Sequence, residues 1–199
     1  MPCYTDQVSE TQRFRGILER AAKLIFQSGF EATSMQQIAE ACGLTKAGLY
    51  HHVKTKEAIL VAIMHYGMDL FDEKVLNPVL AIDDPLDRLR ETMRRNIALV
   101  TEDSSKEVTI ILHEHQTLTG EALKGINVRK KKYVRFLEQS FREAAARGQV
   151  RDIDPTIAAF SFLGSVLWTY KWYRADGAIS TQRLTDGIID LFFAGLLPR

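Results

Sequence analysis

The stretch that decides the fold is GLTKAGLYHHVKTKEAIL, residues 43–60. Gly43 is suited to the left-handed backbone that ends a helix and turns the chain sharply. Thr45 and Thr55 each precede a helix-compatible segment, and a threonine in that place caps the first turn of a helix. The stretch therefore predicts a tight turn, a short helix over KAGLYHHV and a longer helix that begins at Lys56.

The segment before this turn, ATSMQQIAEACG at residues 32–43, predicts another short helix, because it opens with hydroxyl residues suited to N-capping. Two short helices joined by GLT fit a helix-turn-helix, in which the second helix lies in the DNA major groove. The apolar residues of both helices are spaced to pack together: Ile38, Ala39, Cys42, Leu49 and Val53.

Helical periodicity continues along almost the whole chain, and no alternating strand pattern competes with it. Further helices are expected at about 9–29, 56–77, 85–102, 106–115, 120–148, 155–174 and 181–197. We expect an all-α fold with an N-terminal three-helix DNA-binding domain containing the helix-turn-helix, followed by a larger helical domain. The predicted domains are residues 1–55 and 56–199.

The composition indicates the cellular compartment more clearly than it indicates the function. The 26 Lys and Arg nearly balance the 25 Asp and Glu, so any nucleic-acid contact must come from a local basic surface. The two cysteines, Cys3 and Cys42, form no disulfide framework, which fits a reducing cytoplasm. The N-terminus lacks an apolar signal core, and no apolar run approaches the roughly 18 residues of a membrane span. We expect a cytoplasmic protein without a membrane partner.

The histidines do not predict an enzyme. His113 and His115 are two residues apart and would point about 200° apart on a helix, while the neighbours His51 and His52 would point about 100° apart, so neither pair favours a shared metal. Metalloprotease, nucleophile-elbow and phosphate-loop motifs are missing from the sequence. We expect no catalytic residue, no metal site and no cofactor.

The second helix of the motif carries DNA-binding chemistry instead. Lys46 is placed to reach guanine O6 or N7. Ala47 and Gly48 allow the backbone to approach the DNA closely, and Gly48 is otherwise a poor helix former. Tyr50 offers a hydroxyl to phosphate, and Lys56 adds a charge at the start of the next helix. Ser34 and Thr33 offer hydroxyls at the start of the first motif helix.

Residues 12–60 resemble the DNA-binding domain of the tetracycline-repressor (TetR) family of bacterial transcription regulators. The matching elements are G-F-x-x-T-S at residues 29–34, IAEACGLTKAGLYHH at 38–52 and KTKEAIL at 54–60. The resemblance implies DNA contacts at Ser34, Thr45, Lys46, Ala47, Gly48, Tyr50, His51, His52 and Lys56. Met35 stands where many relatives carry a polar or basic residue that contacts DNA.

The resemblance also implies a function, in which the larger helical domain, residues 56–199, is the ligand-binding and dimerisation domain. We expect a ligand-responsive repressor that binds a palindromic operator in double-stranded DNA and is released by a small-molecule effector. The alternative is a small-molecule sensor or protein-interaction module that has lost specific DNA binding. The intact set of Lys46, Tyr50 and Lys56 argues against that alternative.

A homodimer is expected because such regulators place two recognition helices over one palindrome. The last two predicted helices suit a four-helix interface between two subunits. The candidate interface residues are Phe162, Ser165, Ile188 and Phe192. The apolar stripes that they follow are also what an intramolecular core would require, so both interpretations stay open.

An effector site is expected in the second domain, where aromatic residues and polar residues of IILHEHQ at 110–116 suit a mostly apolar pocket. The candidate ligand-binding residues are His113, Gln116, Trp168 and Trp172, and ordinary packing is the alternative for the tryptophans. The segment LWTYKWYRADGAIS, residues 167–180, resembles TetR-type regulators of fatty-acid or sterol catabolism, which respond to acyl-CoA thioesters. An acyl-CoA is therefore one effector that the resemblance implies.

A basic run, NVRKKKYVR at residues 127–135, has two interpretations. Arg129, Lys130 and Lys132 suit the phosphates of a CoA molecule near a pocket mouth. A solvated helix face explains the same run.

Overall fold

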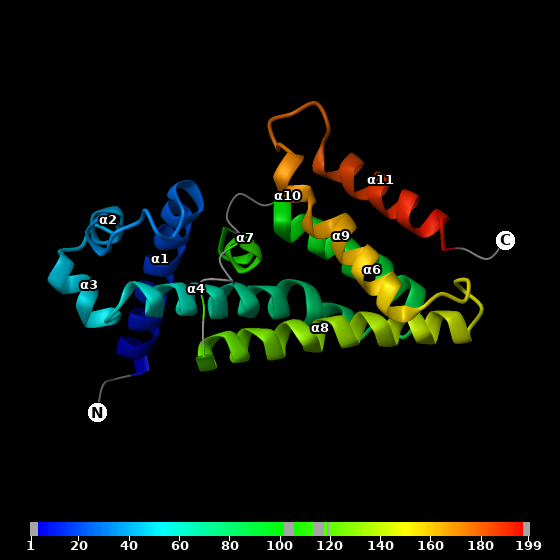
Figure 1. The fold of residues 1–199 in the computed structure, drawn as a ribbon, viewed down its shortest axis with the longest axis horizontal. Helices are drawn as coiled ribbons and strands as arrows, with labels where there is room; N and C mark the ends of the chain where they lie inside the picture. The colour runs from blue at the N-terminus through cyan, green and yellow to red at the C-terminus, as the bar shows by residue number, and fades with distance from the viewer. Residues whose placement is uncertain (1–3, 102–105, 114–117, 119, 197–199) are drawn as a thin grey trace. The chain divides into compact units, whose positions relative to one another are not determined.

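The computed structural model describes residues 4–101, 106–113, 118 and 120–196, without the side chains of residues 4–9, 112 and 113. Every regular element in these ranges is helical, which confirms the all-α prediction (Figure 1). The helices are α1 (Tyr4–Ser28), α2 (Met35–Ala41), α3 (Lys46–His52), α4 (Lys56–Phe71), η1 (Asp72–Leu76), α5 (Asn77–Val79), α6 (Pro85–Thr101), α7 (Lys106–His113), α8 (Gly120–Ala146), α9 (Pro155–Leu167), α10 (Thr169–Trp172) and α11 (Thr181–Ala194). Across the described ranges, no helix is both long and apolar enough to cross a membrane.

Two of the expected helices are interrupted. The helix from Lys56 continues to the predicted region of Asn77, but a π-helical turn, η1, replaces α-helical hydrogen bonds there, and the N–H of Asn77 donates to the carbonyl of Asp72. The expected helix at 155–174 divides at Trp168, which separates α9 from α10. Periodicity alone does not show either break, because the apolar spacing continues through both.

The chain packs as two units, one formed by residues 1–69 and 104–126 and the other by residues 70–103 and 127–199. Two of the three boundaries fall within α4 and α8, and the third follows residue 103. This division by packing differs from the predicted functional boundary at residue 55, which stays a prediction.

The first unit has one hydrophobic core to which α1, α2, α3, α4 and α7 contribute. Gly67 of α4 lies where a β-carbon would stand 2.8 Å from the backbone oxygen of Glu107 in α7. Only glycine permits this close approach, so α7 packs directly on the backbone of α4. Contributors to this core are Ile17, Ala21, Ile25, Ile38, Leu49, Ile59, Ile63 and Ile110.

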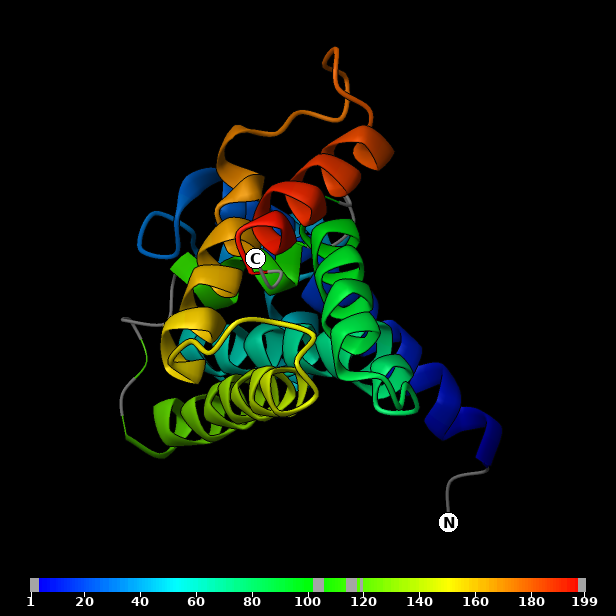
Figure 2. The same cartoon turned by 90° about the vertical axis from the view of Figure 1, so that its right-hand side faces the viewer.

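The second unit is built around α6, α8, α9 and α11. Figure 2 shows α9 and α11 beside α6. Phe141, Phe162 and Phe192 form an edge-to-face aromatic cluster, with ring centroids 5.8 Å apart for Phe162 and Phe192. At one end, Arg88 of α6 pairs with Glu143 of α8 and donates to the hydroxyl of Ser140.

Candidate DNA-binding surface and effector domain

The first motif helix, α2, starts with a capping box. The Ser34 hydroxyl accepts the Gln37 N–H at 3.2 Å, and the Gln37 side-chain oxygen accepts the Ser34 N–H at 2.8 Å. The predicted hydroxyl cap is confirmed, and this pair satisfies two of the N–H groups that a helix start leaves open. Ser34 is exposed and stays a predicted DNA contact.

Thr33 is placed differently from its prediction. Its side chain is 2% exposed, and its hydroxyl donates to the Gly29 carbonyl at 2.8 Å. Its backbone N–H donates to the Phe30 carbonyl at 3.1 Å. Because burial and these bonds hold Thr33 inside the turn between α1 and α2, we assign it to that turn and withdraw it from the DNA contacts.

The turn between α2 and α3 has the predicted construction. Gly43 has a φ of +67°, in the left-handed region. The Thr45 hydroxyl then accepts the Gly48 N–H at 3.0 Å and caps α3. Thr55 caps α4 in the same way, by accepting the Ala58 N–H at 3.1 Å. The two threonine caps predicted from the sequence are confirmed.

A structural reason for glycine at position 48, which the sequence did not reveal, is the space that the cap of α3 needs. A β-carbon at this position would lie 3.2 Å from the Thr45 hydroxyl oxygen, which is tighter than an ordinary contact. The missing side chain therefore leaves room for the cap of α3. Close approach to DNA remains a second, predicted reason for the glycine.

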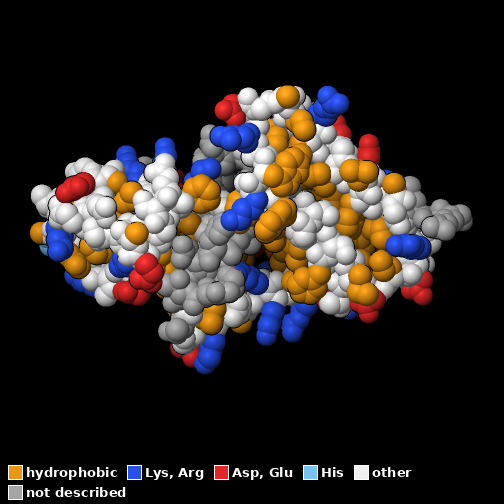
Figure 3. Space-filling model, turned by 45° about the horizontal axis from the view of Figure 1, so that its top comes forward, with side chains coloured by type: hydrophobic (Ala, Val, Ile, Leu, Met, Phe, Trp, Pro, Cys, Tyr) orange, Lys and Arg blue, Asp and Glu red, His pale blue; other side chains and the backbone are white. Residues whose placement is uncertain are grey.

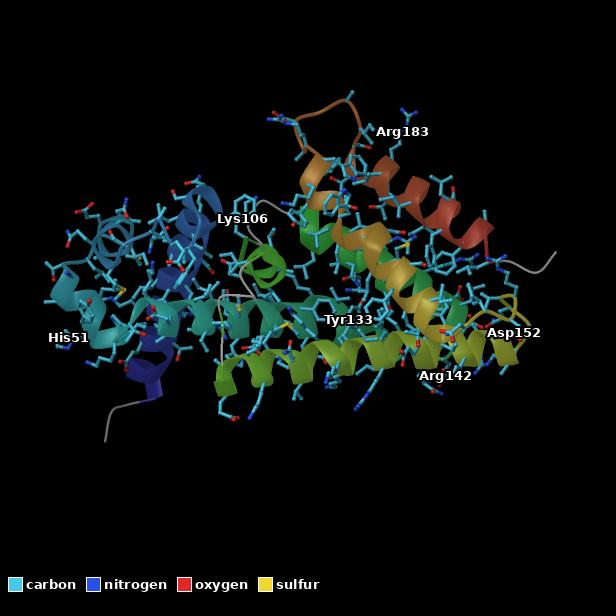
Figure 4. All side chains as sticks on the ribbon, viewed as in Figure 1. His51, Lys106, Tyr133, Arg142, Asp152 and Arg183 are labelled. Atoms are coloured by element: carbon cyan, nitrogen blue, oxygen red, sulfur yellow. The ribbon has the colours of Figure 1, made fainter. Side chains whose placement is uncertain are left out.

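The outer face of α3 carries the remaining candidates. Lys46, Ala47 and His51 are exposed and Tyr50 is half-buried, whereas Leu49 is fully buried against the core. Figure 4 labels His51 on α3 at the outer edge of this helix. The structure thus brings four of the ten predicted contacts, Lys46, Ala47, Tyr50 and His51, onto one accessible helix face.

His52 and Lys54 support α3 from its C-terminal end. The His52 ring stacks on the Phe14 ring of α1, with centroids 6.3 Å apart and 25° between the planes. The Lys54 ammonium donates to the Tyr50 carbonyl at 3.0 Å, where the helix dipole favours a cation. His52 therefore has a packing role beside its predicted DNA contact, and Lys54 is a residue that the sequence analysis did not single out.

Lys56 is held by the protein itself. Its ammonium donates to the carbonyls of Phe30 at 2.9 Å and Glu31 at 3.3 Å, and it lies 4.4 Å from the centroid of the Phe30 ring. No local pattern in the sequence indicates these bonds, because the two carbonyls lie 26 and 25 positions earlier along the chain.

Among the described residues, no group of three or more His, Cys, Asp or Glu is arranged to hold a metal ion. The Cys42 thiol lies 3.8 Å from the Ile17 carbonyl oxygen, and burial raises its pKa above the usual value. A thiol with a raised pKa is a poorer nucleophile at neutral pH.

The two tryptophans do not lie in the interior. Trp168 is 64% exposed at the end of α9, and Trp172 is 52% exposed in α10. A pocket buries the side chains that line it, so we withdraw both as pocket residues of the single chain. Gln116 and the side chain of His113, the other predicted ligand residues, lie outside the part of the chain that the structure describes.

The exposed tryptophans belong to a larger apolar area that we call the outer face. Figure 3 shows hydrophobic side chains gathered on the surface of the second unit. Positions 157, 160, 164 and 168 are three or four residues apart and therefore lie on one side of α9. The large apolar members of the outer face are each at least half exposed. They are Ile157, Phe160, Trp168, Trp172 and Leu191.

The predicted interface residues divide between this face and the core. Ser165 is exposed and its hydroxyl donates to the Ser161 carbonyl. Ile188 and Phe192 are half-buried. Phe162 is 0% exposed in the aromatic cluster of the second unit, so we withdraw it from the interface.

A buried polar group lies within the second unit. The Asn96 side-chain amide donates to the Tyr133 hydroxyl at 2.7 Å and to the Thr92 carbonyl at 2.8 Å. Burial raises the pKa of Tyr133, whose ring meets the Phe71 ring edge-on at 4.5 Å. Figure 4 labels Tyr133 on α8. No local sequence pattern indicates this group, because Asn96 and Tyr133 are 37 positions apart.

The basic run on α8 does not act as one set. The Arg129 guanidinium donates to the Asp72 carboxylate of η1 at 2.5 Å. Lys130 is half-buried, and desolvation lowers its pKa, whereas Lys132 is exposed. Arg129 thus supports the π-helical turn, and only part of the run is a solvated face.

A surface groove of about 460 Å³ lies beside α6. Its charges are already paired within the protein: Glu91 meets Arg94 at 2.9 Å and Arg95 at 2.8 Å, and Asp87 meets Arg90 at 3.8 Å. Because these ion pairs occupy the carboxylates and guanidinium groups, we assign the groove no ligand. Its lining is completed by Pro78 and Ile82.

Two family models match the chain. Residues 17–63 match the model described as bacterial regulatory proteins, tetR family, and residues 83–196 match the tetracyclin repressor-like C-terminal domain. The first match ends within α4 and the second begins just before α6, and together they span most of the chain.

Solved structures and related sequences agree with these matches. The crystal structure of AibR in complex with isovaleryl coenzyme A and operator DNA is similar, with 57% identity and a TM-score of 0.87, over 90% of this chain and 97% of that chain. PfmR from Thermus thermophilus has 30% identity and a TM-score of 0.82, over 92% of this chain and 99% of that one. The transcriptional repressor KstR2 of Rhodococcus jostii is 27% identical over 98% of this chain and 96% of its own length.

Proposed function

Because the chain belongs to the tetracycline-repressor family of bacterial transcription regulators, we propose that it is a repressor that binds operator DNA as a homodimer and leaves it when an acyl-CoA binds. The observation that carries the DNA-binding part is the capped helix α3, which presents Lys46, Ala47, Tyr50 and His51 on one accessible face. We further propose that the protein acts in the cytoplasm, where operator DNA lies, and that it catalyses no reaction.

The proposed DNA contacts follow from the geometry of the motif. α3 enters the major groove, with Lys46 at its N-terminal end placed to donate to a guanine edge. Tyr50 and His51 lie further along the helix and face the phosphates and sugars. Ser34 approaches the DNA backbone from the start of α2. Thr45, Gly48 and His52 complete the set, mainly by holding α3 in shape.

The outer face supports the homodimer. Five large apolar side chains, each at least half exposed, lie on α9, α10 and α11. Large exposed apolar side chains that gather on one surface are unfavourable in water and indicate an interaction surface. A second copy of the chain is the partner that we propose, because a palindromic operator needs two α3 helices about 34–36 Å apart. Ser165 and Ile188 stay in the proposed interface, with Phe192 at its inner edge.

The effector is proposed from the similarity to AibR, whose structure holds isovaleryl coenzyme A. The identity of 57% extends over 90% of this chain and 97% of that chain, so the similarity is not confined to the DNA-binding motif. An effector releases the protein from DNA only if it binds one arrangement of the two α3 helices better than the other. We therefore propose that a CoA thioester favours an arrangement that misfits the operator.

Two assays test this function. In the first, a DNA fragment from upstream of the protein's own gene is titrated at low salt, and a shifted complex is expected. In the second, thermal shift is measured with acyl-CoAs of increasing chain length, and a true effector raises the melting temperature with concentration. The absence of any DNA complex at low salt would contradict the regulator. An acyl-CoA response without a DNA complex would instead indicate a sensor that has lost DNA binding.

A further inference from the structure

Lys56 is the first residue of α4, where a cation is unfavourable because the helix N-terminus carries a partial positive charge. Its ammonium leaves the helix end and donates to two backbone carbonyls, those of Phe30 and Glu31. The Phe30 ring lies under the same ammonium, which adds a cation–π contact. Two of the three donors of this lysine are therefore used within the protein.

The two carbonyls belong to the turn at residues 29–33, which leads directly into α2. The Phe30 carbonyl also accepts the Thr33 N–H, and the Thr33 hydroxyl donates to the Gly29 carbonyl. Ser34, the next residue, caps α2. A bond from Lys56 to this turn thus fixes the start of α2 relative to the start of α4.

We propose that Lys56 is a positioning residue for DNA binding, which holds the turn at residues 29–33 and the start of α2 against α4 instead of neutralising a phosphate. The inference rests on the DNA-binding function proposed above. The sequence alone suggested that the Lys56 ammonium binds DNA, whereas in the structure it binds backbone carbonyls of the protein.

Lys46 is the matched comparison within the same chain. Each lysine is the first residue of a helix and directly follows a threonine cap, Thr45 for Lys46 and Thr55 for Lys56. Lys46 is exposed, whereas Lys56 is half-buried and bound to carbonyls 25 and 26 positions away. Lys46 is therefore the lysine proposed to face DNA, and Lys56 is the lysine that faces the protein.

The test is the salt dependence of operator binding for Lys56→Met, Lys46→Met and the unchanged protein. Methionine keeps an apolar stem against the Phe30 ring but has no donor. Each phosphate contact contributes about 0.9 to the slope of log K against log salt, so a dimer that loses one contact per subunit loses about 1.8. The melting temperature of each protein without DNA is measured in parallel.

For Lys56→Met we expect operator affinity about tenfold lower at every salt concentration, with the slope unchanged. We also expect the melting temperature of the DNA-free protein to fall by about 2 to 4 °C. For Lys46→Met, which removes the proposed contact to a guanine edge, we expect weaker operator binding and an unchanged melting temperature.

The proposal is overturned if Lys56→Met makes the slope shallower by about 1.8, which would show a phosphate contact. It is equally overturned if Lys56→Met leaves the affinity or the melting temperature unchanged. Failure of the unchanged protein to bind the operator would be a failure of the proposed function, and it is seen separately in the same experiment.

Discussion

The outer sides of α3 and α9 differ in chemistry, although both helices have one side buried in a core. The exposed residues of α3 include Lys46 and His51, whereas those of α9 include Ile157 and Phe160. Charged and polar side chains suit a phosphate-rich duplex, and apolar side chains suit another protein surface. The difference supports the proposal that the chain separates DNA contact from self-association by placing them on different helices.

The largest expected effect comes from placing a charge on the apolar side of this comparison. Leu191 is 82% exposed on α11, and Leu191→Asp would bury a carboxylate in the proposed dimer interface. We expect the dimer to weaken by at least about 2 kcal/mol, as for a central interface residue. Light scattering across a concentration series measures the change in oligomeric state.

The control for this variant is Val128→Asp on α8, a residue that is 66% exposed and lies outside the outer face. It should leave the oligomeric state unchanged. A Leu191→Asp protein that stays as dimeric as the Val128→Asp protein would remove α11 from the proposed interface.

A second substitution tests whether α7 is part of the unit that carries α3. At Gly67 the added β-carbon of alanine would stand 2.8 Å from the Glu107 backbone oxygen, so α7 must move away from α4. We expect Gly67→Ala to lower the free energy of unfolding by about 1–3 kcal/mol. Urea denaturation followed by circular dichroism measures it.

Gly16→Ala in α1 is the matched control, because its β-carbon would meet only the flexible end of Arg20, at 3.5 Å. Alanine is the better helix former, so this variant should be stabilised by about 0.5–1 kcal/mol. Equal effects of the two substitutions would show that the contact between α4 and α7 is not tight.

The cap of α3 should have a smaller effect on stability. Thr45→Ala removes the oxygen that accepts the Gly48 N–H, and we expect a loss of about 1 kcal/mol. Thr45→Ser keeps the oxygen and should restore most of that stability. Thermal denaturation of the two variants compares them, and a Thr45→Ala protein as stable as Thr45→Ser would contradict a capping role.

The smallest expected effect is on acid stability in the second unit. Backbone N–H groups, that of Asp87 first, and the Gln149 amide lower the pKa of Asp84 below its usual range. A lowered pKa in the folded state stabilises the fold above the unfolded pKa of about 4, and this stability is lost as the pH falls through the folded value. Denaturation at pH 7 and pH 3 should show a shallower loss for Asp84→Asn than for the unchanged protein. Parallel losses would contradict the assignment.

The motif was predictable from sequence because local rules determine it. Gly43 and the caps at Thr45 and Thr55 depend only on residues within one helical turn, and all three have the expected geometry. Thr33 and Lys56 resemble surface residues in the sequence. Their placement depends on a turn packed against α4, which is a tertiary contact and leaves no local pattern.

The sides of α9 were harder to predict because the helix is apolar all round. Phe160 and Phe162 differ by two positions and therefore lie on nearly opposite sides, but periodicity does not say which side faces the core. In the structure Phe162 is fully buried and Phe160 is 57% exposed. The identity of a neighbouring helix decides this choice, and the same reason explains the misplacement of Trp168.

Coupling between operator DNA and an acyl-CoA on one protein can be tested by a single titration. Operator affinity is measured by fluorescence anisotropy at fixed salt, with isovaleryl coenzyme A, with free coenzyme A and without either. We predict that the thioester weakens operator binding by about 5- to 150-fold and that operator DNA weakens thioester binding by the same factor. Operator affinity that is identical in all three conditions, with the thioester bound, would contradict the account.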